Sequence, residues 1–233
     1  MSVLFPVGVS NRHLHLTRQA MDILFGKGSE LTIFKELYQP GEFASEQIVE
    51  IVGPRGRIPK VRVLGPLRDQ LQVEVSRTDA FHLGINPPIG IFTHLPDGES
   101  IVLNGPNGSM TLTRDVMISR RHIHLSSKEA EEIGVKNGDT VFVAPATIRG
   151  NPAESRMCIL GNTLIRVNDA HRIQLHIDTD EANAAGLVTG DKVFVINAKA
   201  ATMPPSKKLI TEADVKAAIA GNYKIRFVKG MMI

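Results

Sequence analysis

The sequence predicts a mainly β protein built from two tandem-duplicated small β-barrels that are capped by short α-helices. Two observations lead to this fold class. A nine-residue segment around His13 returns around His122, 109 residues later, and repetition of this kind indicates a duplicated unit. Short apolar stretches alternate with clusters of Gly, Pro and Asn, which favours barrels or sandwiches over a doubly wound sheet.

The repeat sets the expected domain boundaries. Its first copy runs from Val9 to Thr17 and its second from Ile118 to Ser126, and from the second position on only the pair Asn11 and Arg120 differs in chemistry. Two lobes of this spacing have an ordinary size for small domains. We therefore expect a first β-barrel domain over residues 12–117 and a second over residues 118–198.

The expected elements follow in chain order. Strands are predicted at Ile48–Val52, Lys60–Leu64, Gln70–Ser76, Ser100–Leu103 and Met110–Leu112. In the second half, short helices at Lys128–Ile133 and Asp180–Ala185 each end at a glycine, Gly134 or Gly186, where a helix C-cap favours positive φ. Residues 199–233 read as a linker and a helical tail, with a helix over 211–220 that Thr211 caps.

Composition excludes several classes of protein. The chain has 233 residues, 42% of them hydrophobic, which suffices for a folded core. It offers no apolar run near the ~18 residues of a membrane helix and no signal peptide, so we expect a cytoplasmic protein without a membrane partner. A single cysteine excludes a disulfide framework. The absence of Trp and the presence of only two Tyr argue against nucleic-acid binding.

The eight histidines carry the functional argument. In a strand, residues two apart share a face, so His13 pairs with His15 and His122 with His124, while the intervening leucines and isoleucine face a core. Two imidazoles side by side form a chelate for zinc or a similar metal. One such pair is weak evidence, but two pairs at equivalent positions of a duplication favour two metal sites.

Each pair needs further ligands. In the second lobe His176 lies on the polar face of an alternating strand, whereas His171 has the other parity and is read as a surface residue. A site of His122, His124 and His176 would be open, as in a catalytic zinc centre. In the first lobe the best further ligand is Glu74, because the two remaining histidines, His82 and His94, lie among apolar and turn residues and read as packing or surface groups.

Cations cluster ahead of Glu74. The cluster comprises Arg55, Arg57, Lys60, Arg62 and Arg68. Arg68 shares strand parity with Glu74, and guanidinium groups bind phosphate or carboxylate in a bidentate manner. The substrate is therefore expected to be an oxyanion. The single Cys158 sits in an apolar run and is expected to pack there without a catalytic role.

These motifs closely resemble the phosphate propanoyltransferase family known as PduL. The resemblance is carried by Ser10 to Leu16, by Gly65 to Arg68 with Gln72 to Glu74, by Ser119 to Leu125 and by His176 to Asn183, and it extends from about Val7 to Val195. It implies two β-barrels with the active site between them. It also implies that the N-terminal strand, residues 1–11, crosses over to join the second barrel.

The resemblance implies a reaction, in which acyl-CoA (propanoyl-CoA or acetyl-CoA) and phosphate interconvert with acyl phosphate and CoA, and two zinc ions per chain. By this resemblance the ligands of one zinc are His13, His15 and Glu74, and those of the other are His122, His124 and His176. Arg68 matches the phosphate-binding arginine. Ser10, Asn11 and Asn183 match positions near coenzyme A, and Arg55 and Arg62 are candidates for its phosphates.

Two departures from the family pattern concern segments of this chain. The stretch Ala144–Glu154 is longer than usual. Since the first predicted strand follows the start of the sequence almost directly, we also expect no N-terminal extension of the kind found in members housed in bacterial microcompartments, as in propanediol degradation. The helix at 211–220 is a candidate substitute for targeting to shell proteins. A homo-oligomer is a further candidate assembly.

Three other functions are weighed against this one. A binuclear zinc hydrolase, cleaving a thioester or phosphate ester with metal-bound water, would not need phosphate as acceptor. A cupin-like barrel also uses His-x-His but requires a nearby Glu, and Leu16 to Gln19 offer none. A metal-binding module without activity would not explain an open three-histidine site beside Arg68.

Overall fold

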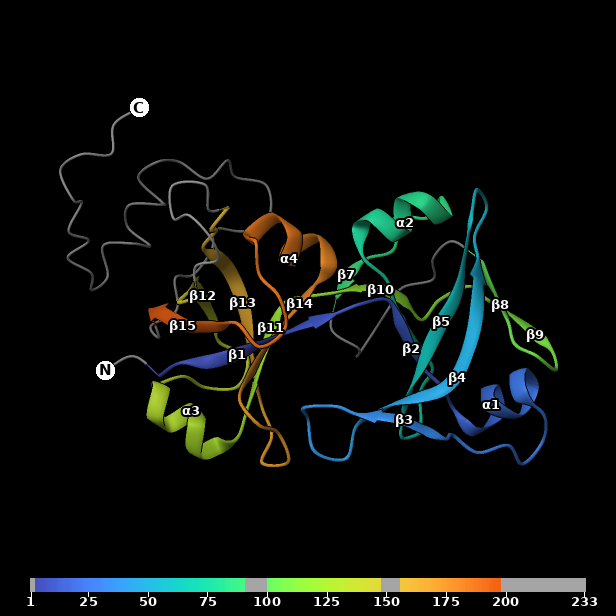
Figure 1. Cartoon of the computed structure of the whole chain (residues 1–233), viewed down its shortest axis with the longest axis horizontal. Helices are drawn as coiled ribbons and strands as arrows, with labels where there is room; N and C mark the ends of the chain where they lie inside the picture. Colours follow the sequence, from blue (N-terminus) through green and yellow to red (C-terminus); the bar gives the residue numbers. More distant parts are fainter. Residues whose placement is uncertain (1–2, 91–99, 148–155, 198–233) are drawn as a thin grey trace.

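The structure is a computed structural model that describes residues 3–90, 100–147 and 156–197. Its elements form two lobes that lie side by side, with short helices at their margins (Figure 1). The prediction of a mainly β fold with short capping helices is confirmed. The predicted tail at 199–233, with its helix at 211–220, lies outside the described residues, as do His94 and most of Ala144–Glu154.

One lobe is a closed barrel in the strand order β1-β14-β11-β13-β12-β15. Its strands are β1 (Phe5–Ser10), β11 (His122–Leu125), β12 (Thr140–Pro145), β13 (Leu160–Val167), β14 (Gln174–Asp178) and β15 (Lys192–Asn197). Apolar side chains from every strand fill its interior, among them Phe5, Ile123 and Leu175, all fully buried. The helices α3 (Ser127–Ile133) and α4 (Thr179–Ala185) follow β11 and β14.

The other lobe is a half-barrel formed by a nine-stranded sheet in the order β7-β10-β6-β2-β5-β4-β8-β9, with β3 paired to β4. Its strands are β2 (His13–His15), β3 (Ile33–Glu36), β4 (Phe43–Val52), β5 (Arg57–Gly65), β6 (Gln72–Glu74), β7 (Ile89–Gly90), β8 (Ile101–Asn104), β9 (Ser109–Leu112) and β10 (Val116–Ser119). Helices α1 (Arg18–Phe25) and α2 (Arg77–Leu83) complete it. Its core gathers Leu14, Met21, Ile51 and Leu103. Each predicted first-lobe strand overlaps an observed one.

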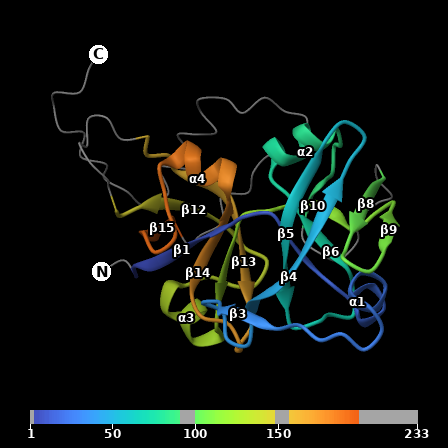
Figure 2. The same ribbon diagram turned by 45° about the vertical axis from the view of Figure 1, so that its right-hand side comes forward.

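The N-terminal strand belongs to the barrel although β2, a few residues later, belongs to the half-barrel. β1 runs parallel to β14 and antiparallel to β15, and the chain then crosses between the lobes to β2 (Figures 1 and 2). The return crossing is made by β10, which pairs with β6 and β7 of the half-barrel. The expected boundary at 117/118 therefore falls inside a strand.

Short helices begin and end where the sequence predicts. Both predicted helices of the second half form, each starting one residue earlier than expected, and both end at a glycine in the left-handed region, Gly134 at φ 80° and Gly186 at φ 64°. The N-terminus of α4 is closed by a capping box of Asp178 and Glu181. Such boxes satisfy backbone amides that the helix itself leaves unpaired.

The lobes are joined by polar contacts, one group of them buried around Gln39. Gln39, which is 3% exposed, donates from Nε2 to the carbonyl of Arg172 at 3.0 Å and accepts from the Arg172 amide at 3.1 Å. The N-termini of α2 and α4 also meet, because the Thr78 amide donates to Asp180 Oδ2 at 2.8 Å. These bonds fix the surfaces that the two lobes turn toward each other.

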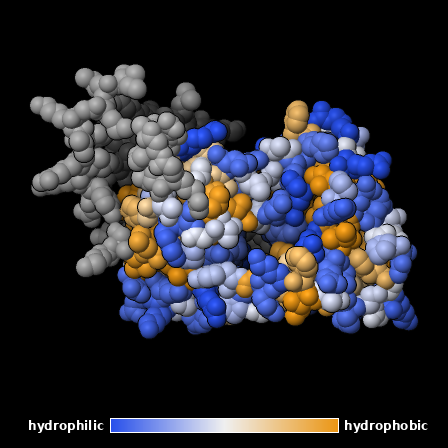
Figure 3. All heavy atoms as spheres, viewed as in Figure 1, coloured by the Kyte–Doolittle hydropathy of each residue, from blue (hydrophilic) through white to orange (hydrophobic). Residues whose placement is uncertain are grey.

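On the face shown in Figure 3, hydrophilic side chains predominate and hydrophobic ones form small patches. Within the described residues, no helix has the length and apolar character to cross a membrane. The expectation that Cys158 packs in a core is wrong, since the residue is exposed. It precedes β13 rather than lying in it, so no strand pairing carries it into the barrel.

Candidate active site

Strand alternation places both histidine pairs on the surfaces that face away from the two cores. Leu14 and Leu16 lie in the core of the half-barrel, so His13 and His15 project from the opposite face of β2. In β11, Ile123 and Leu125 fill the barrel in the same way. His13, His15 and His122 are nevertheless less than 9% exposed, which means that other residues cover these outer faces.

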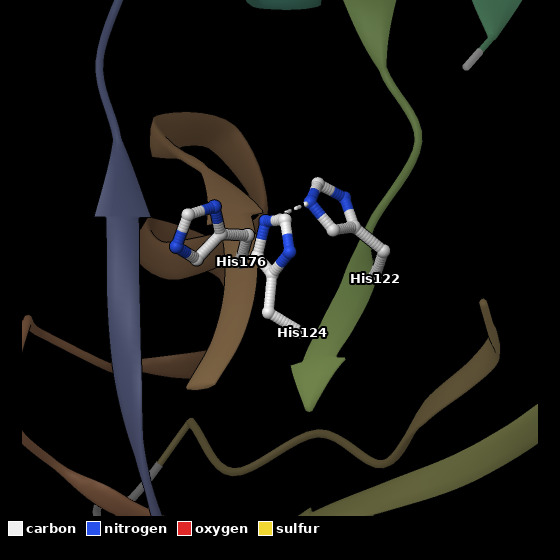
Figure 4. A group of neighbouring side chains, drawn as sticks. All are labelled: His122, His124 and His176. Atoms are coloured by element: carbon white, nitrogen blue, oxygen red, sulfur yellow. Dashed lines mark hydrogen bonds between the residues drawn. The ribbon is translucent and has the colours of Figure 1, made fainter. Parts of the chain in front are cut away.

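In the barrel lobe, His122, His124 and His176 form a compact group whose metal-ligating atoms all lie within 4.8 Å of one another. His122 and His124 come from β11 and His176 from the neighbouring β14, where it is paired in register with His122. Figure 4 shows the three rings converging. The Nε2 atoms of His122 and His124 are 3.0 Å apart, near the ~3.3 Å that tetrahedral zinc with bonds of about 2.0 Å requires.

Hydrogen bonds hold these rings in place. His122 Nδ1 donates to the carbonyl of Arg120 at 2.8 Å, and His176 Nε2 donates to Gln174 Oε1 at 2.7 Å. Each bond leaves the other ring nitrogen free to act as a ligand, as metal-binding histidines usually require. The interpretation of His171 as a surface residue is wrong, because its Nδ1 lies 3.0 Å from His124 Nδ1.

Burial keeps this group neutral. Desolvation lowers the pKa of His122 to about 4, and it lowers the pKa of His124 and His176 as well, with the Arg166 guanidinium acting in the same direction. Neutral imidazole is the form that binds metal ions. Three neutral nitrogen donors in one buried cluster therefore fit zinc or a similar divalent ion with an open position.

The half-barrel brings His13, His15 and Glu74 together more loosely. His13 is paired in register with Glu74, and its Nε2 lies 3.7 Å from Glu74 Oε2. Its Nδ1 donates to the carbonyl of Asn11 at 2.8 Å, which matches the bond from His122 to Arg120. His15 Nδ1 is buried without a hydrogen-bond partner among the described residues. An orphaned buried nitrogen on His15 and a carboxylate near the neighbouring His13 also fit a metal ion.

The predicted cations divide into two groups. Arg68 donates from Nη1 to Gln72 Oε1 at 3.2 Å and from Nη2 to Glu42 Oε1 at 3.0 Å. Burial lowers the pKa of His15, and the charge of Arg68 adds to that shift. Arg62 lies beside His13 in register, with its guanidinium 4.3 Å from the centre of the Phe34 ring. Arg55 is instead held at α2, where it donates to the Phe81 carbonyl at 3.1 Å.

The residues expected near coenzyme A lie around the crossing strand and α4. Ser10 Oγ is 3.3 Å from His13 Nδ1. Asn11 turns its side chain back to accept from the amide of Arg12 at 2.8 Å. Asn183 is exposed on α4.

Two features of the site were not predicted from the sequence. Arg166 on β13 is paired in register with His124. In addition, an arginine before each histidine pair binds the capping carboxylate of the helix that follows the further ligand. These contacts are Arg12 with Asp79 and Arg121 with Glu181. The repeat of Arg12 at Arg121 was visible in the sequence, but its partners required the fold.

Comparison with known proteins identifies the chain. A family model for phosphate propanoyltransferase matches residues 6–188. The phosphate propanoyltransferase of Thermotoga maritima is 49% identical over 190 residues, covering 82% of this chain and 88% of its own. Those of Rhodopseudomonas palustris and Salmonella typhimurium are each 46% identical, covering 81% and 78% of this chain and 80% and 83% of their own.

The fold, the paired histidine sites and these similarities define an acyltransferase. The chain belongs to the phosphate propanoyltransferase family.

Proposed function

We propose that the protein transfers an acyl group reversibly between coenzyme A and phosphate, with propanoyl-CoA or acetyl-CoA as donor, at a site that holds two zinc ions. The observation that carries the proposal is the pair of histidine sites on facing outer surfaces, with Arg68, which is bonded to Glu42, near enough to the first pair for its charge to act on His15. The membership of the chain in the phosphate propanoyltransferase family supports the same reaction. Desolvation lowers the pKa of both His122 and His176, and charges act across the lobes, since Glu74 opposes the shift at His122 and His13 adds to the shift at His176.

The zinc ligands in this proposal are His13, His15 and Glu74 in one lobe and His122, His124 and His176 in the other. Zinc bound there would supply Lewis-acid stabilisation of the thioester oxygen and of the departing thiolate. The chain itself presents neutral nitrogens in the barrel cluster, holds one histidine of each cluster through a backbone carbonyl and largely excludes water from both clusters. These properties are what a preorganised site needs.

Arg68 is the group that we assign to phosphate. A phosphate oxygen attacks the thioester carbonyl carbon, the C–S bond breaks, and the acyl phosphate and the CoA thiolate result. The Arg68 guanidinium would hold the nucleophile by charge-assisted hydrogen bonds. In the structure one of its amino groups is engaged by Glu42, so phosphate competes with that carboxylate for Arg68.

Coenzyme A is proposed to lie along the crossing strand and α4, near Ser10, Asn11 and Asn183. Arg62 and Arg55 would contact its phosphates. The exposed position of Asn183 leaves its amide free for a ligand. A choice between acetyl and propanoyl groups rests on one methylene, worth about 1 kcal/mol or slightly more.

The test is thiol release from propanoyl-CoA by the zinc-loaded protein with and without phosphate. Release that requires phosphate supports the proposal, whereas release that ignores phosphate indicates a thioesterase. Arg68→Ala should keep both zinc ions and lose phosphate-dependent turnover by about 100-fold or more. Arg114→Ala, which changes an exposed arginine after β9, is the matched control. Normal turnover in Arg68→Ala would contradict the assigned role.

The proposed location is the cytoplasm, and within it a bacterial microcompartment whose shell proteins would bind the C-terminal tail. Deletion of residues 205–233 should then abolish co-localisation with shell proteins while leaving activity intact. Unchanged targeting of the shortened protein would refute this role of the tail. Size-exclusion chromatography with light scattering tests the proposed homo-oligomer.

A further inference from the structure

Arg166 occupies a central place in the barrel's outer face. It lies on β13, which runs parallel to β11, and its register partner is His124. The preceding residue, Ile165, is packed in the barrel core, so the Arg166 side chain projects on the side of His124. That side carries the three-histidine group and faces the half-barrel.

The charged groups that act on Arg166 all come from the half-barrel. Its pKa is lowered by desolvation and by Arg68, whereas Glu74 and Glu42 oppose the shift. Glu74 belongs to the first histidine site and Glu42 is the ion-pair partner of Arg68. Arg166 and Arg68 are therefore two guanidinium groups, one from each lobe, that both interact with Glu42, and Arg166 also interacts with Glu74 of the first histidine site.

Among the described residues, no carboxylate forms an ion pair with Arg166. By contrast, Arg12, Arg68 and Arg121 each bind a carboxylate. A partly buried guanidinium next to a like charge is unfavourable unless an anion joins it. The planar fork of arginine suits the oxygen atoms of phosphate.

The duplication gives a second argument. In the half-barrel the strand beside the histidine pair carries Arg62 next to His13, and the residue two positions on is Leu64. In the barrel the order is reversed, with Leu164 next to His122 and Arg166 next to His124. The duplicated strands thus place their guanidinium groups at different positions along the paired histidines, which indicates that the groups have separate tasks.

We propose that Arg166 is a second anion-binding residue of the active site and that it and Arg68 hold the phosphoryl group from opposite lobes. This inference rests on the proposed acyl transfer to phosphate and deepens it. The phosphate or acyl phosphate would bridge the half-barrel and the barrel, with one guanidinium from each. Both lobes must then be docked for phosphate to bind.

The experiment compares zinc-loaded wild type with Arg166→Gln, Arg166→Lys and the control Arg172→Gln, which changes an exposed arginine on the segment after β13. In Arg166→Gln the KM for phosphate should rise about 10- to 100-fold, as expected for loss of a charge-assisted bidentate contact. The KM for propanoyl-CoA and the zinc content should stay unchanged. Arg166→Lys keeps the positive charge but lacks the planar guanidinium fork, so its KM for phosphate should lie between those of wild type and Arg166→Gln.

A structural role would give a different pattern. If Arg166 only supports the fold or the histidines, the substitutions will lower zinc content or kcat and leave the KM for phosphate near the wild-type value, which would overturn the inference. If Arg166→Gln fails to fold, the KM for phosphate of Arg166→Lys decides between phosphate binding and a structural role.

Direct titration of zinc-loaded protein with inorganic phosphate separates this inference from the proposed function. If wild type releases thiol without phosphate yet binds phosphate more tightly than Arg166→Gln, the acyl transfer is refuted and the anion site stands. If wild type turns over with phosphate and all variants bind phosphate equally, only the role of Arg166 is refuted. If wild type binds no phosphate, both fail.

Discussion

Of the two duplicated ion pairs, Arg12 with Asp79 and Arg121 with Glu181, removal of the first should lower the free energy of unfolding more. Arg12 Nε donates to Asp79 Oδ2 at 2.9 Å, and its Nη2 lies 2.8 Å from Oδ1, so the contact is bidentate. Asp79 Oδ2 also accepts from the Ser76 amide at 3.2 Å, which completes the capping box of α2. The Asp79 side chain is 7% exposed, and water therefore cannot replace these bonds without rearrangement.

The magnitude follows from these contacts. Asp79→Ala removes the capping partner of the Ser76 amide, which costs about 1 kcal/mol. It also leaves the Arg12 guanidinium unpaired, which costs about 2 kcal/mol, below the ~3–5 kcal/mol of a fully buried pair because that side chain is 35% exposed. The expected loss in the free energy of unfolding is about 3 kcal/mol.

Glu181 provides the matched comparison. It occupies the same position in the capping box of α4 and binds Arg121, but its side chain is 23% exposed. Glu181→Ala should therefore cost less, about 1–2 kcal/mol. The assay is urea unfolding of both zinc-free variants followed by circular dichroism. A loss below about 1 kcal/mol in Asp79→Ala, or a larger loss in Glu181→Ala, would refute the reasoning.

Three further predictions concern the site and the contact between lobes. His171→Ala should weaken binding of one of two zinc ions about 10-fold by releasing His124, with His82→Ala as an exposed control, and equal affinities in a competition assay would contradict this. In zinc-free protein the lowered pKa of His122, about 4, means that the folded state binds fewer protons than the unfolded state between that value and about 6.5. The free energy of unfolding should thus fall by up to about 3 kcal/mol as pH drops through this window, and a His122→Gln variant with an equally steep decline would disprove the cause. Gln39→Ala should cost about 2 kcal/mol in urea unfolding by breaking buried bonds between lobes, more than Gln47→Ala in the half-barrel.

Local patterns explain which features the sequence could predict. The alternation of histidine with leucine or isoleucine assigned one face of β2 and β11 to a core, and Leu14 and Ile123 are fully buried as expected. Gly134 and Gly186 end helices because left-handed backbone at a C-cap needs no side chain. Each of these inferences depends only on neighbours within a few residues.

Features set by distant pairing could not be predicted in this way. His171 was assigned to the surface by strand parity, but β14 begins only at Gln174, and parity has no meaning in the loop that brings its ring to His124. The prediction that Cys158 is buried was wrong for a similar reason, since an apolar run outside a strand is not carried into a core. Arg166 meets His124 only because β11 and β13 pair in parallel, a long-range contact that local periodicity does not encode.

The two histidine sites share the same supporting hydrogen bonds and strand pairing, but the charge of their third residue differs. Each first histidine donates to the carbonyl two residues before it, and each further ligand lies opposite it in an antiparallel pair. That ligand is Glu74 in the half-barrel and His176 in the barrel. A divalent ion would therefore keep less net positive charge in the first site than in the second, where all donors are neutral. With a divalent ion bound, the stronger residual charge in the barrel would suit an anionic thiolate or oxyanion. The two sites thus share one arrangement of supporting bonds, and the exchange of Glu74 for His176 would suit them, as the proposed metal sites, to different parts of a single reaction.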